Sequence, residues 1–288
     1  MGEAAGGTGT PLREGADVLR RHNVTVSGPT AKEAGVATVV LGHGFATDQR
    51  IWRRIRPWLD RRFRTVTFDM AGCGGAAADS HDPLRHATLG GYADDLLAIL
   101  DALGIARCVY LGHDAGAMAG ALAAVEAPER FERMVLLAPS PCLVTRRGYR
   151  AGLPPQAAQA IVGAMTANYA GWAREYAALT VGGAPGCAAA AEVAGCLSAL
   201  RPDIAFQQAV TVFQSDLRGW IDGLTVPAAI VHAQGDPLVP LDAVRHLQRV
   251  WPGAALEVLP VGGHLPHLTA PDRVISVLVR HLKGMAAA

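Results

Sequence analysis

Two carboxylates and an imidazole follow apolar runs of the sequence in an order that suits nucleophilic catalysis. Asp114 lies in Gly-His-Asp-Ala-Gly, Asp236 in Gln-Gly-Asp-Pro and His264 in Gly-Gly-His-Leu. A Gly-x-nucleophile-x-Gly turn between a strand and a helix exposes its middle residue, and an acid and then a histidine follow along the chain. In such a set the imidazole acts as the base and the acid fixes its tautomer. The order and context predict Asp114, Asp236 and His264 as catalytic residues.

The middle residue of this turn is a carboxylate where a serine is expected. A serine forms an acyl-enzyme that water clears, and an aspartate cannot follow that route. A carboxylate can instead attack saturated carbon, as in epoxide hydrolases and dehalogenases, and a histidine-activated water then releases the alkyl-enzyme ester. Those enzymes often have Trp or Arg after the aspartate, where this chain has Ala115. Ester cleavage is therefore expected to be weak or absent, and alkyl chemistry stays as an alternative.

Two backbone N–H groups could stabilise negative charge beside Asp114. Phe45 follows His43 and Gly44 after one apolar run, and Ala115 follows the turn itself. Backbone donors at these two places form the oxyanion site of such enzymes. Because any residue type can supply an N–H, only the positions of Phe45 and Ala115 support this prediction.

Alternating strands and helices must position these groups. Compact apolar runs with many β-branched residues predict strands, and longer amphipathic stretches predict helices. Such alternation is typical of an α/β protein with a mostly parallel central sheet flanked by helices, whose ligand crevice lies at the carboxyl ends of the strands. We expect strands over residues 36–41, 64–68, 108–111, 134–137, 227–233 and 255–259. We expect helices over residues 48–59, with Asp48 as N-cap, 89–103, 115–125, 202–215, 216–222, 241–250 and 271–282.

An Ala-rich segment without strand patterns interrupts this alternation. Residues 139–200 predict helices over 155–167, 169–179 and 188–200, and we interpret the segment as a helical cap, or lid, inserted in the core. The core then comprises residues 18–138 and 201–283, and it begins with a helical turn and a short strand within 18–26. We expect a flexible tail over residues 1–17 and a frayed one over residues 284–288.

Composition narrows the possible partners and the location. The chain has 288 residues, a net charge of +1 and no long basic run, so nucleic acid and anionic membranes are not expected as partners. The first ten residues show no signal-peptide pattern, and no apolar run is long enough to span a bilayer. Five cysteines without paired spacing favour reduced thiols in the cytoplasm, with the nucleus as a further possible location. No disulfide, metal site or cofactor is expected.

Longer motifs around these residues resemble those of one family. They are Gly-His-Gly-Phe-Ala-Thr-Asp-Gln at 42–49, Asp-Asp-Leu-Leu-Ala-Ile-Leu-Asp-Ala-Leu at 94–103, Ala-Pro-Ser-Pro at 138–141, Asn-Tyr at 168–169, Trp172, Val-Gly-Gly at 181–183, Arg-Pro-Asp-Ile-Ala at 201–205, Phe-Gln-Ser-Asp-Leu-Arg at 213–218 and Gly-His-Leu-Pro-His-Leu at 263–268. Over about residues 18–283 the chain resembles the plant karrikin and strigolactone receptor-hydrolases and their bacterial relatives, the RsbQ-type stress regulators. Residues 201–204 and 264–268 favour the plant branch.

The resemblance implies an α/β-hydrolase fold with a V-shaped, four-helix lid over an apolar pocket. Members of the family bind butenolide-type ligands, hydrolyse some of them slowly and signal through partner proteins. This implies a small apolar lactone-type ligand and a signalling partner that docks on the cap. Aromatic residues are common in the family at positions 143 and 193, so we expect a roomier or differently shaped pocket here. By local match the pocket positions are Phe45, His113, Leu143, Ile161, Trp172, Tyr176, Val193 and Phe213.

Three hypotheses follow for the function. In the first, Asp114 disables ester cleavage and pairs with a protonated His264, and the protein is a receptor for a butenolide-, strigolactone- or karrikin-like molecule. In the second, Asp114 is a live nucleophile or water-orienting base that acts on an epoxide or haloalkane. In the third, the chain is an inactive form of a serine hydrolase. The family resemblance favours the first hypothesis.

Overall fold

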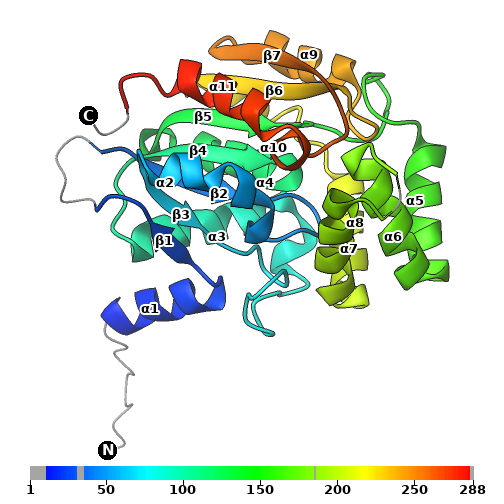
Figure 1. Ribbon diagram of the computed structural model, residues 1–288, viewed down its shortest axis with the longest axis horizontal. Coiled ribbons are helices and arrows are strands. Elements are labelled where there is room, and N and C mark those ends of the chain that lie inside the picture. The colour runs from blue at the N-terminus through cyan, green and yellow to red at the C-terminus, as the bar shows by residue number, and fades with distance from the viewer. Residues whose placement is uncertain (1–10, 31–35, 185, 286–288) are drawn as a thin grey trace, which may run out of the picture.

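A seven-stranded sheet forms the centre of the computed structural model, which describes residues 11–30, 36–184 and 186–285 (Figure 1). The strand order is β1-β3-β2-β4-β5-β6-β7. β1 pairs with β3 in antiparallel orientation, and the other neighbours pair in parallel. The strands are β1 (Thr25–Ser27), β2 (Thr38–Gly42), β3 (Arg64–Thr67), β4 (Cys108–His113), β5 (Phe131–Leu137), β6 (Ala228–Gly235) and β7 (Ala254–Gly262).

Helices flank this sheet and bury its central strands. Every residue of β2 and β4 is buried, which parallel strands covered on both faces require. The arrangement confirms the predicted α/β class with a mostly parallel sheet. The helices outside the cap are α1 (Pro11–Arg21), α2 (Arg56–Asp60), α3 (Leu89–Ala102), α4 (Asp114–Glu126), α9 (Leu241–Val250), α10 (Pro266–Thr269) and α11 (Pro271–His281), with short 3-10 helices η1 (Gln49–Arg54), η2 (Arg85–Ala87), η3 (Pro128–Arg130) and η4 (Ile221–Gly223).

Four further helices form a group at one end of the sheet, on the right in Figure 1. They lie between β5 and β6 in the chain, where the sequence predicts a cap. The sequence-based boundary at residue 200 assigns the last of them to the core, whereas the structure groups it with the other three (Figure 1). We call these four helices the cap: α5 (Pro155–Ala167), α6 (Tyr169–Val181), α7 (Ala188–Ala199) and α8 (Pro202–Gln214).

The two ends of the chain are more ordered than the sequence suggests. Residues 11–17, expected as part of a tail, belong to helix α1. At the other end the Met285 carbonyl accepts a hydrogen bond from the Ala37 N–H at 3.3 Å, so residue 285 is not frayed. The remaining parts of the two expected tails, residues 1–10 and 286–288, lie outside the described residues.

Two predicted helices also differ in detail. The stretch 48–59 forms a 3-10 helix followed by the short α2, although Asp48 does cap it, accepting the Arg50 N–H at 2.9 Å. The stretch 216–222 is mostly a turn, in which the Asp216 carboxylate accepts two hydrogen bonds of 2.7 Å from Arg218. Such local side-chain bonds compete with helix formation.

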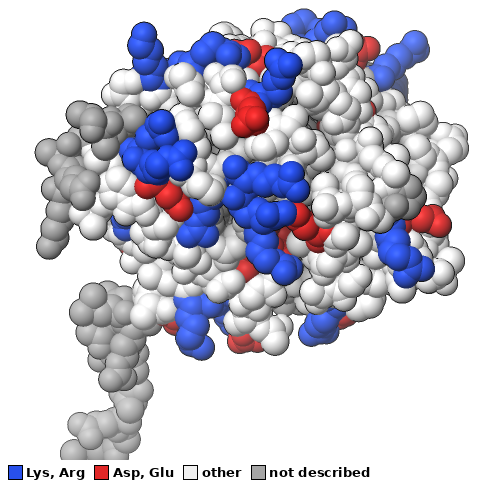
Figure 2. All heavy atoms as spheres, viewed as in Figure 1, with Lys and Arg blue, Asp and Glu red and all other residues white. Residues whose placement is uncertain are grey.

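One hydrophobic core joins the sheet, its flanking helices and the cap. Trp52 beside the sheet and Leu136 in β5 are fully buried, and Trp172 and Val193 of the cap belong to the same cluster. Outside the core, Figure 2 shows basic side chains in separate groups, several of them with acidic neighbours. Among the described residues, no helix combines the length and apolarity needed to cross a membrane.

Candidate active site

Asp114 occupies a sharp turn at the carboxyl end of the central strand β4. Its backbone φ is +50°, a left-handed conformation that aspartate tolerates better than most residues. A side chain at Gly116 would overlap the His43 carbonyl oxygen, and a Cβ at Gly112 would lie 2.6 Å from the Ala117 Cα. The two glycines therefore permit the tight turn that presents Asp114 at the crevice.

Each carboxylate oxygen of Asp114 faces a different partner. Oδ2 accepts a hydrogen bond from the Phe45 N–H at 2.9 Å. Oδ1 lies 3.8 Å from the His264 Nε2 atom. Because Asp114 is the first residue of α4, the partial positive charge of the helix N-terminus also favours its negative charge. The carboxylate thus occupies the N–H group that the sequence predicts as an oxyanion donor.

Asp236 orients His264 from the other side. The Asp236 Oδ2 atom lies 2.8 Å from the His264 Nδ1 atom, and its Oδ1 accepts the N–H groups of Leu238 and Val239 at 2.8 and 3.0 Å. Burial lowers the pKa of His264, but attraction to Asp236 and then Asp114 outweighs burial and raises this pKa to about 9. Burial raises the pKa of Asp236, and attraction to His264 reverses this to a net lowering. At neutral pH His264 is therefore a cation between two carboxylates.

Other histidines support this triad without sharing its charge. The His113 Nε2 atom lies 3.0 Å from the His264 carbonyl oxygen. Its ring lies 4.8 Å from that of His264 and 4.7 Å from that of His267. Burial, followed by repulsion from neighbouring imidazoles, lowers the pKa of both His113 and His267, so each is neutral. In the turn that carries Phe45, His43 Nε2 accepts the Met70 N–H at 2.8 Å.

Comparison with known proteins places this chain in a family. The family model for the α/β hydrolase fold matches residues 37–271. A probable esterase from Oryza sativa subsp. japonica is 41% identical over 92% of this chain and 97% of its own length. A karrikin insensitive 2 receptor from Petunia hybrida is 37% identical over 92% and 97% of the two chains, and a strigolactone esterase from Arabidopsis thaliana 36% over 92% and 98%. The chain belongs to the α/β-hydrolase family, in the group that contains these karrikin receptor and strigolactone esterase relatives.

A solved structure supports the fold of this α/β hydrolase independently. The structure of a hydrolase from Oleispira antarctica superposes with a TM-score of 0.87 at 27% sequence identity, over 93% of this chain and 97% of that one. The likeness covers both the sheet and the inserted helices because it spans nearly the whole of both chains.

A cavity of about 10 Å³ adjoins Asp114 under the cap of this α/β hydrolase. Of the eight predicted pocket positions, four line it: Phe45, His113, Tyr176 and Val193. The other four do not: Leu143, Trp172 and Phe213 are buried elsewhere, and Ile161 is half-buried. The cavity holds no more than about one water molecule.

Packed aromatic rings fill the space where a larger pocket is expected. The Trp172 and Tyr176 rings stack with centroids 5.0 Å apart, and Phe45 meets Tyr176 edge-on at 6.1 Å. The roomier pocket that Leu143 and Val193 suggest is therefore not found at Asp114 in the described structure. The other expectation, a differently shaped pocket, stays a prediction.

Sequence patterns missed several cavity residues. Thr47, Thr180, Leu197 and Leu265 also line the cavity. Thr180 stands one helical turn after Tyr176, a spacing that places both on one face of α6 and could have indicated it. No cluster of three or more metal-ligating side chains occurs in the part of the chain that the structure describes.

Proposed function

We propose that the protein is a receptor for a small apolar lactone, of the butenolide, strigolactone or karrikin type, with weak or no ester hydrolysis. The names of its plant relatives support this class of ligand. The hydrogen bond from the Phe45 N–H to Asp114 is the observation that supports weak or absent ester hydrolysis. Cap helices whose position depends on the ligand would present a changed surface to a signalling partner protein.

Ester hydrolysis lacks two requirements at this site. The Phe45 N–H, which would stabilise a substrate oxyanion, already binds a carboxylate. His264, with a pKa of about 9, already carries the proton that a general base must remove from a nucleophile. Asp114 thus stands in both the nucleophile position and the charge-binding position of the reaction.

Ligand binding at this site requires the cap to move. Ligand pockets in proteins enclose about 300–1,000 Å³, whereas the cavity at Asp114 encloses about 10 Å³. Tyr176 and Val193 of the cap close it above Asp114. A lactone therefore enters only when α6 and α7 separate from the core, and this movement would couple binding to the outer surface of the cap.

Restoring the serine tests the proposal. We expect Asp114→Ser to raise hydrolysis of a fluorogenic butenolide or aryl ester by about 100-fold or more, because it frees the oxyanion donor and lets the His264 pKa fall. Asp114→Asn, which is nearly isosteric and lacks a nucleophile, is the matched control. Equal turnover by the unaltered protein and the serine variant would refute the disabled-site proposal. Absence of any butenolide-dependent change in Tm across a panel would refute the receptor proposal.

A second candidate function rests on the orientation of the Asp114 carboxylate. Phe45 holds Oδ2 and leaves Oδ1 on the His264 side, the arrangement that a carboxylate nucleophile needs. Attack by Asp114 would break the carbon–halogen bond of a haloalkane and release halide, or break a C–O bond of an epoxide and leave an alkoxide that takes a proton from water. Either reaction would convert Asp114 to a neutral ester, and the loss of its charge would lower the pKa of His264 toward that of a base. Intact-mass analysis of the His264→Gln variant after incubation with such compounds should reveal an alkyl adduct. A panel without adduct or turnover excludes this candidate.

A further inference from the structure

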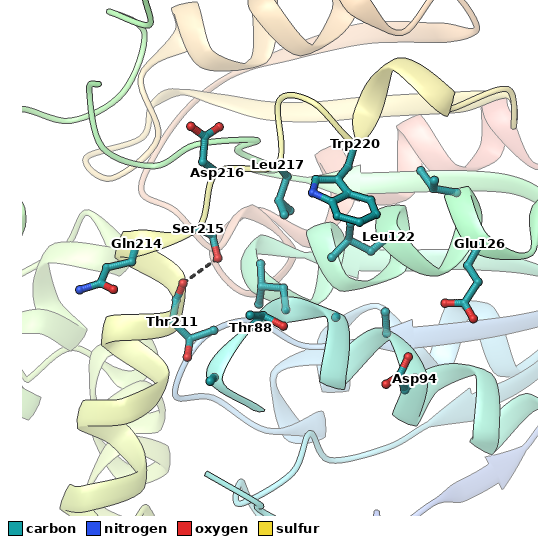
Figure 3. A pocket seen from close by; sticks show the side chains of 15 residues that line it. Thr88, Asp94, Leu122, Glu126, Thr211, Gln214, Ser215, Asp216, Leu217 and Trp220 are labelled. Atoms are coloured by element: carbon teal, nitrogen blue, oxygen red, sulfur yellow. Dashed lines mark hydrogen bonds between the residues drawn. The ribbon is translucent and has the colours of Figure 1, made fainter. Parts of the chain in front are cut away.

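A second, larger concavity lies outside the cap site. It encloses about 740 Å³ between the start of α3, the end of α4, the end of α8 and the loop that carries Trp220 (Figure 3). Its lining and that of the cavity at Asp114 have no described residue in common. The proposed receptor function does not use this groove.

Apolar side chains form the floor of the groove. Leu89, Leu122 and Leu217 line it from three different segments of the chain. The indole of Trp220 stands beside Leu122 and Leu217 (Figure 3), and Trp220 is 60% exposed. An exposed indole above an apolar floor offers both hydrophobic contact and a π face to a bound molecule.

Two carboxylates give the groove a negative charge. Asp94 from α3 and Glu126 from α4 both line it (Figure 3). Neither forms an ion pair with any Lys, Arg or His that the structure describes. The third carboxylate of the lining, Asp216, is neutralised by Arg218 at 2.7 Å. A neutral or anionic ligand would leave the charges of Asp94 and Glu126 uncompensated, whereas a cation would complement them.

We propose that this groove is a binding site for a small organic cation, an ammonium group attached to an aromatic or aliphatic body. The ammonium group lies near Asp94 and Glu126, and the apolar body covers the leucine floor beside the indole of Trp220 (Figure 3). The volume lies within the range of small-molecule pockets, about 300–1,000 Å³, which favours a small ligand over a peptide segment. The attraction between the ammonium group and the two carboxylates is electrostatic, so the affinity falls as ionic strength rises.

Calorimetric titration of the full chain with three matched probes tests this site. The probes are 2-phenylethylammonium, the neutral 2-phenylethanol and the anionic phenylacetate. We expect 2-phenylethylammonium to bind at least about tenfold more tightly than 2-phenylethanol, and phenylacetate to bind least. Equal affinity for the amine and the alcohol, or no saturation by the amine at millimolar concentration, would overturn the proposal.

Conservative variants distinguish binding of the amine in the groove from its non-specific attraction to a negatively charged surface. Asp94→Asn and Glu126→Gln should each weaken amine binding about threefold, and Trp220→Ala about fivefold. Glu175→Gln on the cap makes the same charge change at an exposed site, and Phe206→Ala removes another exposed ring, so neither should alter binding. If these control variants weaken amine binding as much as the groove variants do, the amine does not bind in the groove and the proposal is overturned.

Two further titrations test where the amine binds and whether a peptide binds in its place. Asp114→Asn should leave amine binding unchanged, because Asp114 lies outside the groove lining; a loss of binding would place the amine under the cap and overturn the proposal. A short Lys- and Leu-containing peptide should bind no more tightly than the amine. A peptide that binds 100-fold more tightly through Asp94 and Glu126 would replace the small-molecule ligand with a protein partner.

Discussion

His264 lies between two carboxylates, with Asp236 at 2.8 Å and Asp114 at 3.8 Å. A serine at position 114 would leave one carboxylate, and the imidazole could then cycle between neutral and charged forms. With two carboxylates the charged form is stabilised in the folded protein. Proton uptake by His264 is therefore linked to folding as well as to chemistry.

We expect stability to fall as pH rises from about 6.5 to about 9. The His264 pKa is about 9 in the folded protein against 6.5 unfolded, so the folded state binds more protons in this window. The contribution, about 3 kcal/mol at most, is complete below pH 6.5 and lost above pH 9. Urea denaturation at several pH values measures it, and Asp114→Asn should reduce the slope. A free energy of unfolding that is flat or rises across this window would contradict the ion-pair arrangement.

At the scale of elements, the sequence predicts where the strands and the cap helices lie along the chain, but not how the helices group in space. β-branched buried runs such as Val39 and Val40 in β2 predict strands directly, because few other structures accommodate them. The predicted ranges 155–167, 169–179 and 188–200 match α5, α6 and α7 to within two residues, but the sequence pattern does not show that α8 groups with them. Helix α1 was missed because its Gly- and Ala-rich surroundings resemble a tail.

For the candidate site, the sequence predicts individual residues but not the contacts that depend on tertiary packing. The motifs predict Asp114, Asp236 and His264, since each follows a recognisable strand. They do not predict that Phe45 donates to Asp114, because that bond depends on the approach of two turns 69 residues apart in the chain. They also do not predict the closed cavity, since ring packing between Trp172 and Tyr176 depends on how the cap rests on the core.

One cap helix is joined to the core by charge. Glu192 of α7 accepts hydrogen bonds from Arg53, one of them 2.9 Å long, and lies 3.6 Å from Arg54. Both arginines belong to η1 beside the sheet. Because cap movement must precede ligand entry in the proposed receptor, this contact should slow entry.

We expect Glu192→Gln to speed ligand association and hydrogen exchange in α7. The global free energy of unfolding should change by about 1 kcal/mol or less, because partly exposed ion pairs contribute little. Stopped-flow binding of a butenolide and exchange mass spectrometry measure the two effects. Glu175→Gln in α6, exposed and without an ion-pair partner among the described residues, is the control. Unchanged exchange in α7 would show that the contact does not hold the cap.

At the scale of the whole molecule, the cap and the sheet share their hydrophobic core. Trp172 and Val193 of the cap belong to the same buried cluster as Leu136 and Val40 of the sheet. Neither part can therefore unfold without exposing apolar surface of the other. Local opening of α6 and α7 for a ligand differs from unfolding, because it leaves the sheet intact.

We expect the cap and the sheet to unfold in one cooperative transition. Leu136→Ala in the sheet should lower the free energy of unfolding by about 2–5 kcal/mol and Trp172→Ala in the cap by about 3–5 kcal/mol, because both side chains are buried. In each variant, the denaturation midpoints followed by far- and near-ultraviolet circular dichroism should fall by the same denaturant concentration. Leu84→Ala, at a residue that is 89% exposed, should shift neither signal. If Trp172→Ala splits the transition, so that cap amides exchange at denaturant concentrations that leave the sheet protected, then the cap is a separate folding unit resting on a finished core.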